Sequence, residues 1–337
     1  MVTLNELTNM NDQGAPAIEA RGVTKQFGEV LAVDAASFGV RKGEMFGFLG
    51  PNGAGKTTTI NMLTGLARPT AGTIHYFGHD LTRNVKKAQH LMGVVPDESN
   101  LYPELTGVDN LCFCASLYGM RKRARLDRAR ALLAQFGLVD AAGRKFAAYS
   151  KGMKRKLAIA AGIIHEPPIL FLDEPTTGID VPSARQIRQM LADLKSRGTT
   201  IFLTTHYIEE AERLCDRLAF IVDGRVVRVD TLAALVRDIQ DQHVVELALT
   251  GGEGDLTSAL HNAFPEGRFK RVSDSVLRMR TDCTIQLAPL IRFLEERGVG
   301  VTEARVLRPS LEDVFVEITG IELERMRKEK EKGGRGS

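Results

Sequence analysis

The chain has 337 residues, of which 43% are hydrophobic and 26% charged, so it can bury the cores of about two domains. Its 45 basic and 42 acidic residues leave a formal net charge of only +3, which offers no support for a nucleic-acid-binding surface. No run of 18 or more apolar residues occurs, so no membrane-spanning helix is predicted.

The N-terminal residues and the cysteines indicate the compartment. Residues 1–16 are polar and lack an apolar signal core, so we expect a loose leader on a chain that stays in the cytosol. The cysteines form no C-x-x-C pair and have no histidine at zinc spacing, which predicts reduced structural thiols rather than a metal site. They are Cys112, Cys114, Cys215 and Cys283.

Two short strands are expected first, over Ile18–Val23 and Val30–Phe38, because apolar residues alternate in part of each. Phe27 lies on the turn between them. An aromatic side chain at such a turn can stack on a purine base, although a single phenylalanine in a small domain more often belongs to the core.

A strand, a glycine-rich loop and a helix come next. The short apolar run Met45–Leu49 predicts a buried strand, and Thr57–Thr64 predicts a helix start. The residues that join them match G-x-x-x-x-G-K-[ST] at every position. They are Gly50, Pro51, Asn52, Gly53, Ala54, Gly55, Lys56 and Thr57, followed by Thr58.

This loop predicts a triphosphate site. Its glycines allow the backbone to curl around an anion, and the helix N-terminus directs free amides into the curl. Lys56 can reach the β- and γ-phosphates, and the Thr57 hydroxyl can complete a Mg²⁺ shell. The alternative is a glycine-rich turn that precedes a lysine by coincidence.

Further strands are expected over Thr73–Phe77 and Met92–Val95. Asp97 follows the second of them and is therefore expected at the sheet edge where α/β proteins bind their ligands. Residues 108–136 predict helices that contain a basic run at 121–125. This run is typical of a solvated helix face, with contact to an acidic partner or to lipid head groups as the alternative.

Ser150 is well placed to cap a helix that continues through Ile164, and with Gly152 it offers a hydroxyl and free amides to an anion. The run Ile169–Leu172 does not alternate, which predicts a strand buried on both faces.

That strand ends in two adjacent carboxylates. Asp173 can hold Mg²⁺, directly or through water. Glu174 points elsewhere because side chains alternate along a strand, and it can accept a proton from an attacking water. The alternative is a pair of acids that cap a helix.

The last elements of the first domain are a strand over Thr200–Thr205 that ends at His206, and a hairpin over Ala219–Val227. A histidine at a sheet edge can contact a γ-phosphate or a lytic water, or simply be tolerated there. We expect this domain to cover residues 17–237.

A second domain is expected over residues 243–320, followed by a frayed, mixed-charge tail over 321–337. The pattern of the second domain is β-α-β-β-α-β, consistent with a small ferredoxin-like α+β unit. No set of catalytic residues is recognised in it. The expected elements are the strand His243–Leu249, the helix Leu256–Ala263, the strands Arg268–Val272 and Val276–Met279, the helix Ile285–Arg297, the strand Val299–Leu307 and a final helix Ser310–Thr319.

The glycine-rich loop, the helix capped by Ser150, the Asp173–Glu174 strand end and His206 follow one another in this order. With these motifs, the segment from Ile18 to Leu235 resembles the nucleotide-binding subunit of an ATP-binding-cassette (ABC) transporter. The resemblance implies an α/β P-loop fold in which a parallel-sheet core carries a β-subdomain and a helical subdomain. It also assigns roles to particular residues. Phe27 matches the aromatic that stacks on adenine, residues 50–57 match Walker A, and Ile169–Asp173 matches Walker B. Glu174 matches the catalytic glutamate and His206 the switch histidine. Asp180 is the last residue of the D-loop, Gly178–Asp180.

Residues 149–153 stand where the family carries Leu-Ser-Gly-Gly-Gln. Ser150 and Gly152, which the resemblance expects to contact the γ-phosphate of a second copy, are kept, whereas Lys151 and Met153 depart from the pattern. Asp97 occupies the place of the Q-loop glutamine, and its shorter, charged side chain can still reach Mg²⁺ or its water.

The resemblance implies a homodimer that sandwiches ATP and a separate membrane permease. Residues 309–315, Pro-Ser-Leu-Glu-Asp-Val-Phe, resemble the C-terminal signature of cassettes that serve multidrug, antibiotic-resistance and sodium exporters. We therefore expect a peripheral ATPase on the cytoplasmic face of the membrane, with no nucleic-acid partner, that drives export of a drug, an ion or a lipid-like substrate.

Two alternatives remain open. A soluble cassette ATPase of ribosomes or DNA usually has two cassettes or a long coiled-coil insertion, and this sequence has neither. A non-catalytic nucleotide sensor would explain Asp97 and Met153 as marks of a degenerate site.

Overall fold

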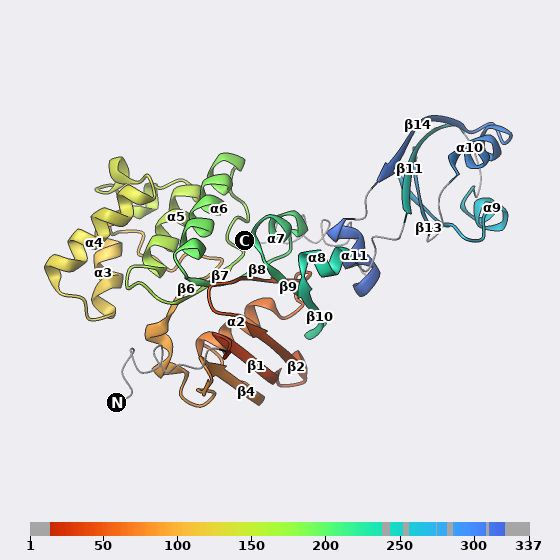
Figure 1. Ribbon diagram of the computed structural model, residues 1–337. Helices are drawn as coiled ribbons and strands as arrows, with labels where there is room; N and C mark the ends of the chain where they lie inside the picture. Colours follow the sequence, from red (N-terminus) through yellow and green to blue (C-terminus); the bar gives the residue numbers. More distant parts are fainter. Residues whose placement is uncertain are drawn as a thin grey trace. The chain divides into compact units, whose positions relative to one another are not determined.

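The computed structural model describes residues 14–237, 243–251, 256–273, 275–281, 286–307 and 310–320. The chain divides into two compact units, of which the first ends at Thr231 and the second spans Leu232–Gly320 (Figure 1). Most of the expected leader, the tail over 321–337, residues 238–242, Cys283, Ile285 and Pro309 lie outside the described residues. No helix in the described ranges is long and apolar enough to cross a membrane.

The first unit contains a four-stranded antiparallel sheet in the order β2-β1-β4-β5. Its strands are β1 (Ile18–Phe27), β2 (Val30–Val40), β4 (Ala71–Tyr76) and β5 (His79–Asp80). Strand β1 is longer than the sequence pattern predicts. Its register with β2 shifts after Ala20, next to Gly22 at φ 58°, and this irregularity absorbs the break in alternation.

A six-stranded sheet forms the centre of the first unit, in the order β10-β9-β3-β8-β7-β6. All of its strand pairs are parallel except the β9–β10 hairpin. The strands are β3 (Met45–Leu49), β6 (Met92–Val95), β7 (Ile169–Asp173), β8 (Thr200–Thr205), β9 (Arg217–Val222) and β10 (Arg225–Thr231). Every residue of β3, β7 and β8 is buried, as the apolar runs Met45–Leu49 and Ile169–Leu172 predict for the first two.

The main core of this unit lies between the two sheets. Side chains of the antiparallel sheet, such as Ile18 and Phe38, pack in one cluster with Phe46, Phe171 and Phe202 of the parallel sheet. The ring centroids of Phe38 and Phe202 are 5.9 Å apart, and those of Phe171 and Phe202 are 5.6 Å apart. This packing fixes the strand ends that carry the polar residues described below.

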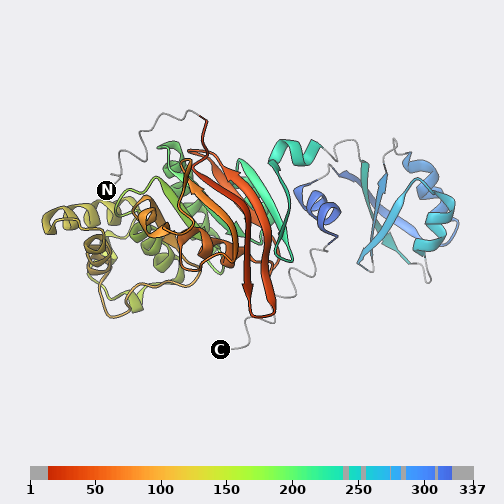
Figure 2. The ribbon, with the colours of Figure 1, turned by 90° about the horizontal axis from the view of Figure 1, so that it is seen from below.

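Helices cover the parallel sheet and form a separate helical group. Their bounds are α2 (Lys56–Thr64), α3 (Gly107–Leu117), α4 (Lys122–Gln135), α5 (Lys151–Gly162), α6 (Val181–Ser196) and α7 (Ile208–Leu214), with 3-10 turns at Val85–Lys87, Gln89–Leu91, Val139–Ala141 and Phe146–Ala148. In both views α3 and α4 lie to one side of this unit, away from β1 and β2 (Figure 1 and Figure 2). The expected basic run begins α4, and residues 121–124 are exposed.

The second unit has a four-stranded antiparallel sheet in the order β12-β13-β11-β14. Leu260 of α9 and Leu290 and Leu294 of α10 pack with Leu247 and Leu277 of the sheet in one buried cluster. The bounds are α8 (Leu232–Arg237), β11 (His243–Thr250), α9 (Leu256–Ala263), β12 (Arg268–Ser273), β13 (Val276–Thr281), α10 (Leu287–Glu295), β14 (Gly300–Leu307) and α11 (Leu311–Thr319). The order between α8 and α11 is β-α-β-β-α-β.

Candidate active site

The loop over residues 50–57 is shaped by two glycines in the left-handed region. Gly53 has φ 80° and Gly55 has φ 100°. A Cβ atom at Gly55 would lie 2.5 Å from the Ala32 carbonyl oxygen, so only glycine fits there. Gly55 is also the N-cap of α2 and makes no side-chain cap, which leaves the first amides of that helix for an anion.

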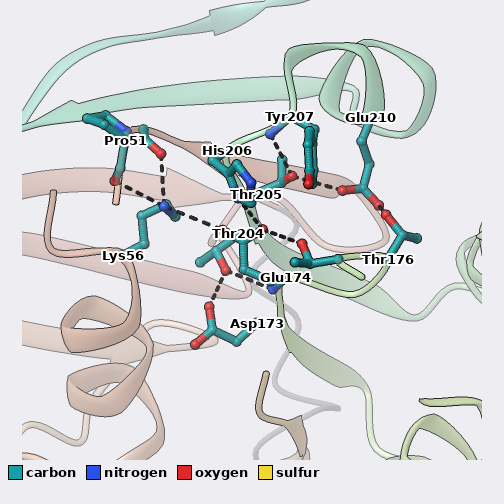
Figure 3. Close-up of polar contacts among 12 residues, drawn as sticks. Pro51, Lys56, Asp173, Glu174, Thr176, Thr204, Thr205, His206, Tyr207 and Glu210 are labelled. Carbon is teal, nitrogen blue, oxygen red and sulfur yellow. Dashed lines mark hydrogen bonds and ion pairs between the residues drawn. The ribbon is translucent and has the colours of Figure 1, made fainter. Parts of the chain in front are cut away.

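Lys56 folds back over this loop. Its Nζ atom donates to the carbonyl oxygens of Gly50 at 2.8 Å and of Pro51 at 3.1 Å. It also lies 3.4 Å from Glu174 Oε1 (Figure 3). Lys56 is only 7% exposed, so its charge is held inside the loop and opposite a carboxylate.

Asp173, at the end of β7, joins the loop to the neighbouring strand β8. Thr57 Oγ1 donates to Asp173 Oδ2 at 2.9 Å, and Thr204 Oγ1 donates to Asp173 Oδ1. A hydroxyl and a carboxylate therefore meet beside the anion-binding loop. Such an all-oxygen donor set fits Mg²⁺, and Thr57 and Asp173 are the residues that would hold it.

Glu174 directs its side chain away from Asp173. Its φ of 49° turns the backbone at the end of β7, and its amide donates to Thr204 Oγ1 at 3.2 Å. Its Oε2 atom accepts from Thr177 Oγ1 at 3.0 Å and lies 2.8 Å from His206 Nδ1. A non-glycine residue in this backbone region is strained, and such strain gathers at functional sites.

The surroundings of Glu174 keep it ionised. Burial opposes ionisation, but the hydrogen bond with His206 and the charge of Lys56 together hold the pKa of Glu174 below its usual value. Two buried atoms here, Glu174 Oε1 and His206 Nε2, make no hydrogen bond within the described residues. Because buried polar atoms are rarely left unbonded, these two atoms are suited to bind a ligand or water.

Three predicted residues lie apart from this group. Ser150 caps α5, its Oγ accepting from the Met153 amide at 3.3 Å, and Asp180 caps α6, its Oδ1 accepting from the Ser183 amide at 2.9 Å. A Cβ atom at Gly152 would lie 2.5 Å from Ser183 Oγ, so α5 and α6 meet closely there. Across the ranges that the structure describes, no hydrogen bond or ion pair joins Ser150, Gly152 or Asp180 to residues 50–57.

Phe27 and Asp97 are the remaining predicted site residues. Phe27 ends β1 rather than lying on a turn, and it is 53% exposed, with Lys25 Nζ 4.7 Å from its ring centroid. Partial burial raises the pKa of Asp97. The Asp97 backbone carbonyl accepts a hydrogen bond from Arg155 at 3.2 Å.

Sequence reasoning missed several residues that organise the site. Thr204 bonds both Asp173 and the Glu174 amide, and Thr177 bonds the Glu174 carboxylate. Glu210, on α7, accepts from Thr176 Oγ1 and, at 2.8 Å, from Thr205 Oγ1 (Figure 3). The available signal in the sequence was Thr204-Thr205, which directly follows the apolar residues 201–203 at the end of β8.

Glu210 should make the stability of the first unit depend on pH. Burial raises its pKa above the usual 4.5, with the hydrogen bonds from Thr176 and Thr205 opposing the shift. A carboxyl with a raised pKa in the folded chain costs stability once it ionises. The loss begins as the pH rises through the usual carboxyl value and is complete above the raised pKa.

We therefore expect Glu210→Gln, which keeps hydrogen-bonding groups for both threonines, to raise Tm near pH 8 by roughly 2–4 °C, or about 1 kcal/mol. The difference should shrink as the pH falls toward 5. Thermal unfolding of both proteins, followed by circular dichroism across this range, measures it. A Tm that is lower in the variant near pH 8 would show that the ionised carboxylate stabilises the fold.

Comparisons with known proteins identify the family of this chain. The model of the ABC transporter family matches residues 33–177. The chain is 33% identical over 308 residues to the linearmycin resistance ATP-binding protein LnrL of Bacillus subtilis (strain 168), covering 90% of this chain and 98% of that protein. It is 37% identical over 325 residues to the daunorubicin/doxorubicin resistance ATP-binding protein DrrA of Streptomyces peucetius, covering 92% and 94%.

A solved structure resembles part of this chain. The dimeric structure of MJ0796, a bacterial ABC transporter cassette, matches with a TM-score of 0.59 and 29% identity, covering 64% of this chain and 98% of that one. The resemblance and the cassette fold predicted from the sequence are thus confirmed. By its motifs, its fold and its relatives, this chain belongs to the ATP-binding subunits of ABC transporters.

Proposed function

We propose that this chain hydrolyses ATP in the presence of Mg²⁺ and so powers a separate membrane permease that exports a drug, an ion or a lipid-like substrate. One observation carries the proposal. Three neighbouring parallel strands, β3, β8 and β7, end together in an anion-binding loop, a histidine and a pair of carboxylates. This is the set of groups that phosphoryl transfer to water requires.

The nucleotide would be held from several elements. Phe27 would stack on the adenine, because its ring is exposed at the end of β1. Residues 50–58 would hold the phosphates through loop amides, Lys56 and the start of α2. Thr57 and Asp173, with Asp97 nearby, would hold Mg²⁺, which when bound supplies charge that offsets the negative charge on the phosphate oxygens.

Glu174 would act on the attacking water. Its Oε1 atom lies 3.4 Å from Lys56 Nζ. A triphosphate would draw Lys56 toward its oxygens, which would free Oε1 to accept a proton from water. His206 and Thr177 hold the other carboxylate oxygen, so the reactive oxygen keeps a fixed direction.

A second copy of the chain would complete the site. The N-terminus of α5 is exposed at Ser150 and Lys151. We propose that Ser150 and Gly152 of one copy face the loop over residues 50–57 of the other, with Asp180 beside them, and that ATP closes this homodimer. The solved cassette that this chain resembles is dimeric, which supports this arrangement.

The names of the relatives support the coupling to export. A relative from Burkholderia orbicola (strain AU 1054), 39% identical over 310 residues, is named Nod factor export ATP-binding protein I. LnrL and DrrA are both named as resistance ATP-binding proteins. We propose that this chain likewise docks on the cytoplasmic face of the membrane, as a peripheral subunit, against a permease encoded by another gene. No nucleic-acid partner is part of the proposal.

The proposal is tested with the membrane protein of about six spans that we expect to be encoded beside this gene. Membranes with and without that protein are mixed with the chain, and sedimentation of the chain and phosphate release are measured. The chain should bind only the permease-containing membranes, and its ATP hydrolysis should change when bound. Equal sedimentation and equal hydrolysis on both membranes would contradict the coupling.

A further inference from the structure

A buried arginine lies on α5, outside the sequence motifs described above. Arg155 is 7% exposed and follows Ser150, the N-cap of the same helix, by little more than one turn. Its Nε donates to the Pro175 carbonyl at 3.0 Å, Nη2 donates to the Asp173 carbonyl, and Nη1 donates to the Pro96 carbonyl and, at 3.2 Å, to that of Asp97. One guanidinium therefore satisfies four backbone carbonyls.

These carbonyls belong to two segments that carry carboxylates of the site. Pro96 and Asp97 follow β6, whereas Asp173 ends β7 and Pro175 comes directly after Glu174. Carbonyls just beyond the end of a parallel strand lose their partners in the sheet, and leaving them buried without a donor is costly. The fork of a guanidinium supplies several donors in fixed directions, so it sets the relative position of the groups that it joins.

The far end of α5 is fixed on the same sheet by close backbone contact. A Cβ atom at Gly93 of β6 would lie 2.1 Å from the Gly162 carbonyl oxygen, and a Cβ atom at Gly162 would lie 2.7 Å from Val95 Cγ2. Helix α5 is thus held at its last residue by glycine contacts and near its start by Arg155. The helix cannot shift at Ser150 without disturbing the Arg155 hydrogen bonds.

We propose that Arg155 is a positioning residue for hydrolysis, which holds the Asp97 loop and the Asp173–Glu174 strand end in a fixed relation to the N-terminus of α5. This inference rests on the proposed function. Arg155 would link the N-terminus of α5, which is proposed to contact the nucleotide of the second copy, to Asp173 and Glu174, which are proposed to act on the nucleotide of the same copy. Lysine cannot replace it, because an ammonium on a flexible stem cannot reach both segments with defined geometry.

The test compares Arg155→Lys with wild type. We expect kcat for ATP hydrolysis to fall by about 10- to 100-fold, the effect of misplacing catalytic groups by about 1 Å. The Mg²⁺ concentration for half-maximal activity should rise, because both segments that Arg155 joins carry expected Mg²⁺ contacts. ATP affinity should stay within about twofold, since no hydrogen bond or ion pair joins Arg155 to residues 50–57 in the described ranges.

Arg128→Lys is the matched control. Arg128, on α4, also donates to a backbone carbonyl, that of Ile164 at 3.4 Å, and pairs with Glu166 at 3.1 Å, but its side chain is 30% exposed. We expect wild-type kcat and Mg²⁺ dependence for this variant. A second variant, Arg155→Ala, adds chemical rescue. Free guanidinium ions, kept below denaturing concentrations, should restore part of its turnover.

The outcomes separate the inference from the proposed function. Wild-type kcat and Mg²⁺ dependence in Arg155→Lys would overturn the positioning role. The positioning role would also be overturned if the loss of turnover were fully explained by weaker ATP binding or by less folded protein, and if guanidinium gave no rescue. If wild type itself released no phosphate from ATP, the proposed function would fail instead.

Discussion

Replacing Glu174 by glutamine should lower ATP hydrolysis by about 10²- to 10⁴-fold, the range for loss of a general base, while ATP still binds. Glutamine has the same shape and can keep the contacts with Thr177 and His206, but its amide does not take a proton from water. It also removes a negative charge that lies 3.4 Å from Lys56, where phosphates would repel it. The ATP-bound homodimer should therefore accumulate.

Phosphate release measures the loss of turnover, and equilibrium binding of ATP measures the retained affinity. Glu209→Gln is a suitable control, because its side chain is 72% exposed on α7 and pairs only loosely with Arg213 at 3.7 Å. We expect wild-type turnover from that control. Turnover in Glu174→Gln equal to wild type would remove Glu174 from its proposed role.

Replacing Lys56 by alanine should weaken ATP binding by about 100-fold, since a hydrogen bond to a charged partner contributes up to about 3 kcal/mol. Lys56 supplies the buried positive charge of the loop, and its removal leaves Glu174 facing the phosphates without a cation. Hydrolysis should be lost together with binding. Titration calorimetry with ATP and Mg²⁺ gives the affinity directly.

Lys42→Ala serves as the control for this change. Lys42 is exposed in the turn before β3, where its Nζ lies 5.5 Å from the Phe77 ring centroid. Its loss removes the same charge from the chain outside the loop. Because Lys56→Ala also loses two hydrogen bonds to loop carbonyls, its Tm should be measured alongside. A folded Lys56→Ala protein with wild-type affinity for ATP would contradict the proposed nucleotide site.

The strands that carry the site could be predicted because their sequences admit few alternatives. Met45–Leu49, Ile169–Leu172 and Thr200–Thr205 are short, mostly apolar runs, and such runs become strands buried on both faces. Polar residues directly after them must then meet at one sheet edge. The sequence alone therefore predicts that the loop over residues 50–57, Asp173, Glu174 and His206 lie close together.

The hydrogen bonds within the site could not be predicted in this way. Thr57 and Asp173, or Arg155 and Pro96, are distant in the sequence, and only the packing of several elements brings them together. Residues 154–156 read Lys-Arg-Lys, and no local pattern shows that the middle residue alone is buried. Likewise, α8 packs with α11, which is remote in the chain, and both lie in the unit Leu232–Gly320.

The central claim is that ATP is held between residues 50–57 of one copy and the N-terminus of α5 of another. It is tested most directly by cross-linking two single-cysteine variants, Asn52→Cys and Lys151→Cys, each combined with Glu174→Gln. Both are made in a chain whose four native cysteines, Cys112, Cys114, Cys215 and Cys283, are replaced by alanine. Both positions are exposed. The account predicts a covalent dimer in the mixture with ATP and Mg²⁺, and little in either variant alone or without nucleotide. A mixture that forms no more dimer with ATP than its separate components do would contradict it.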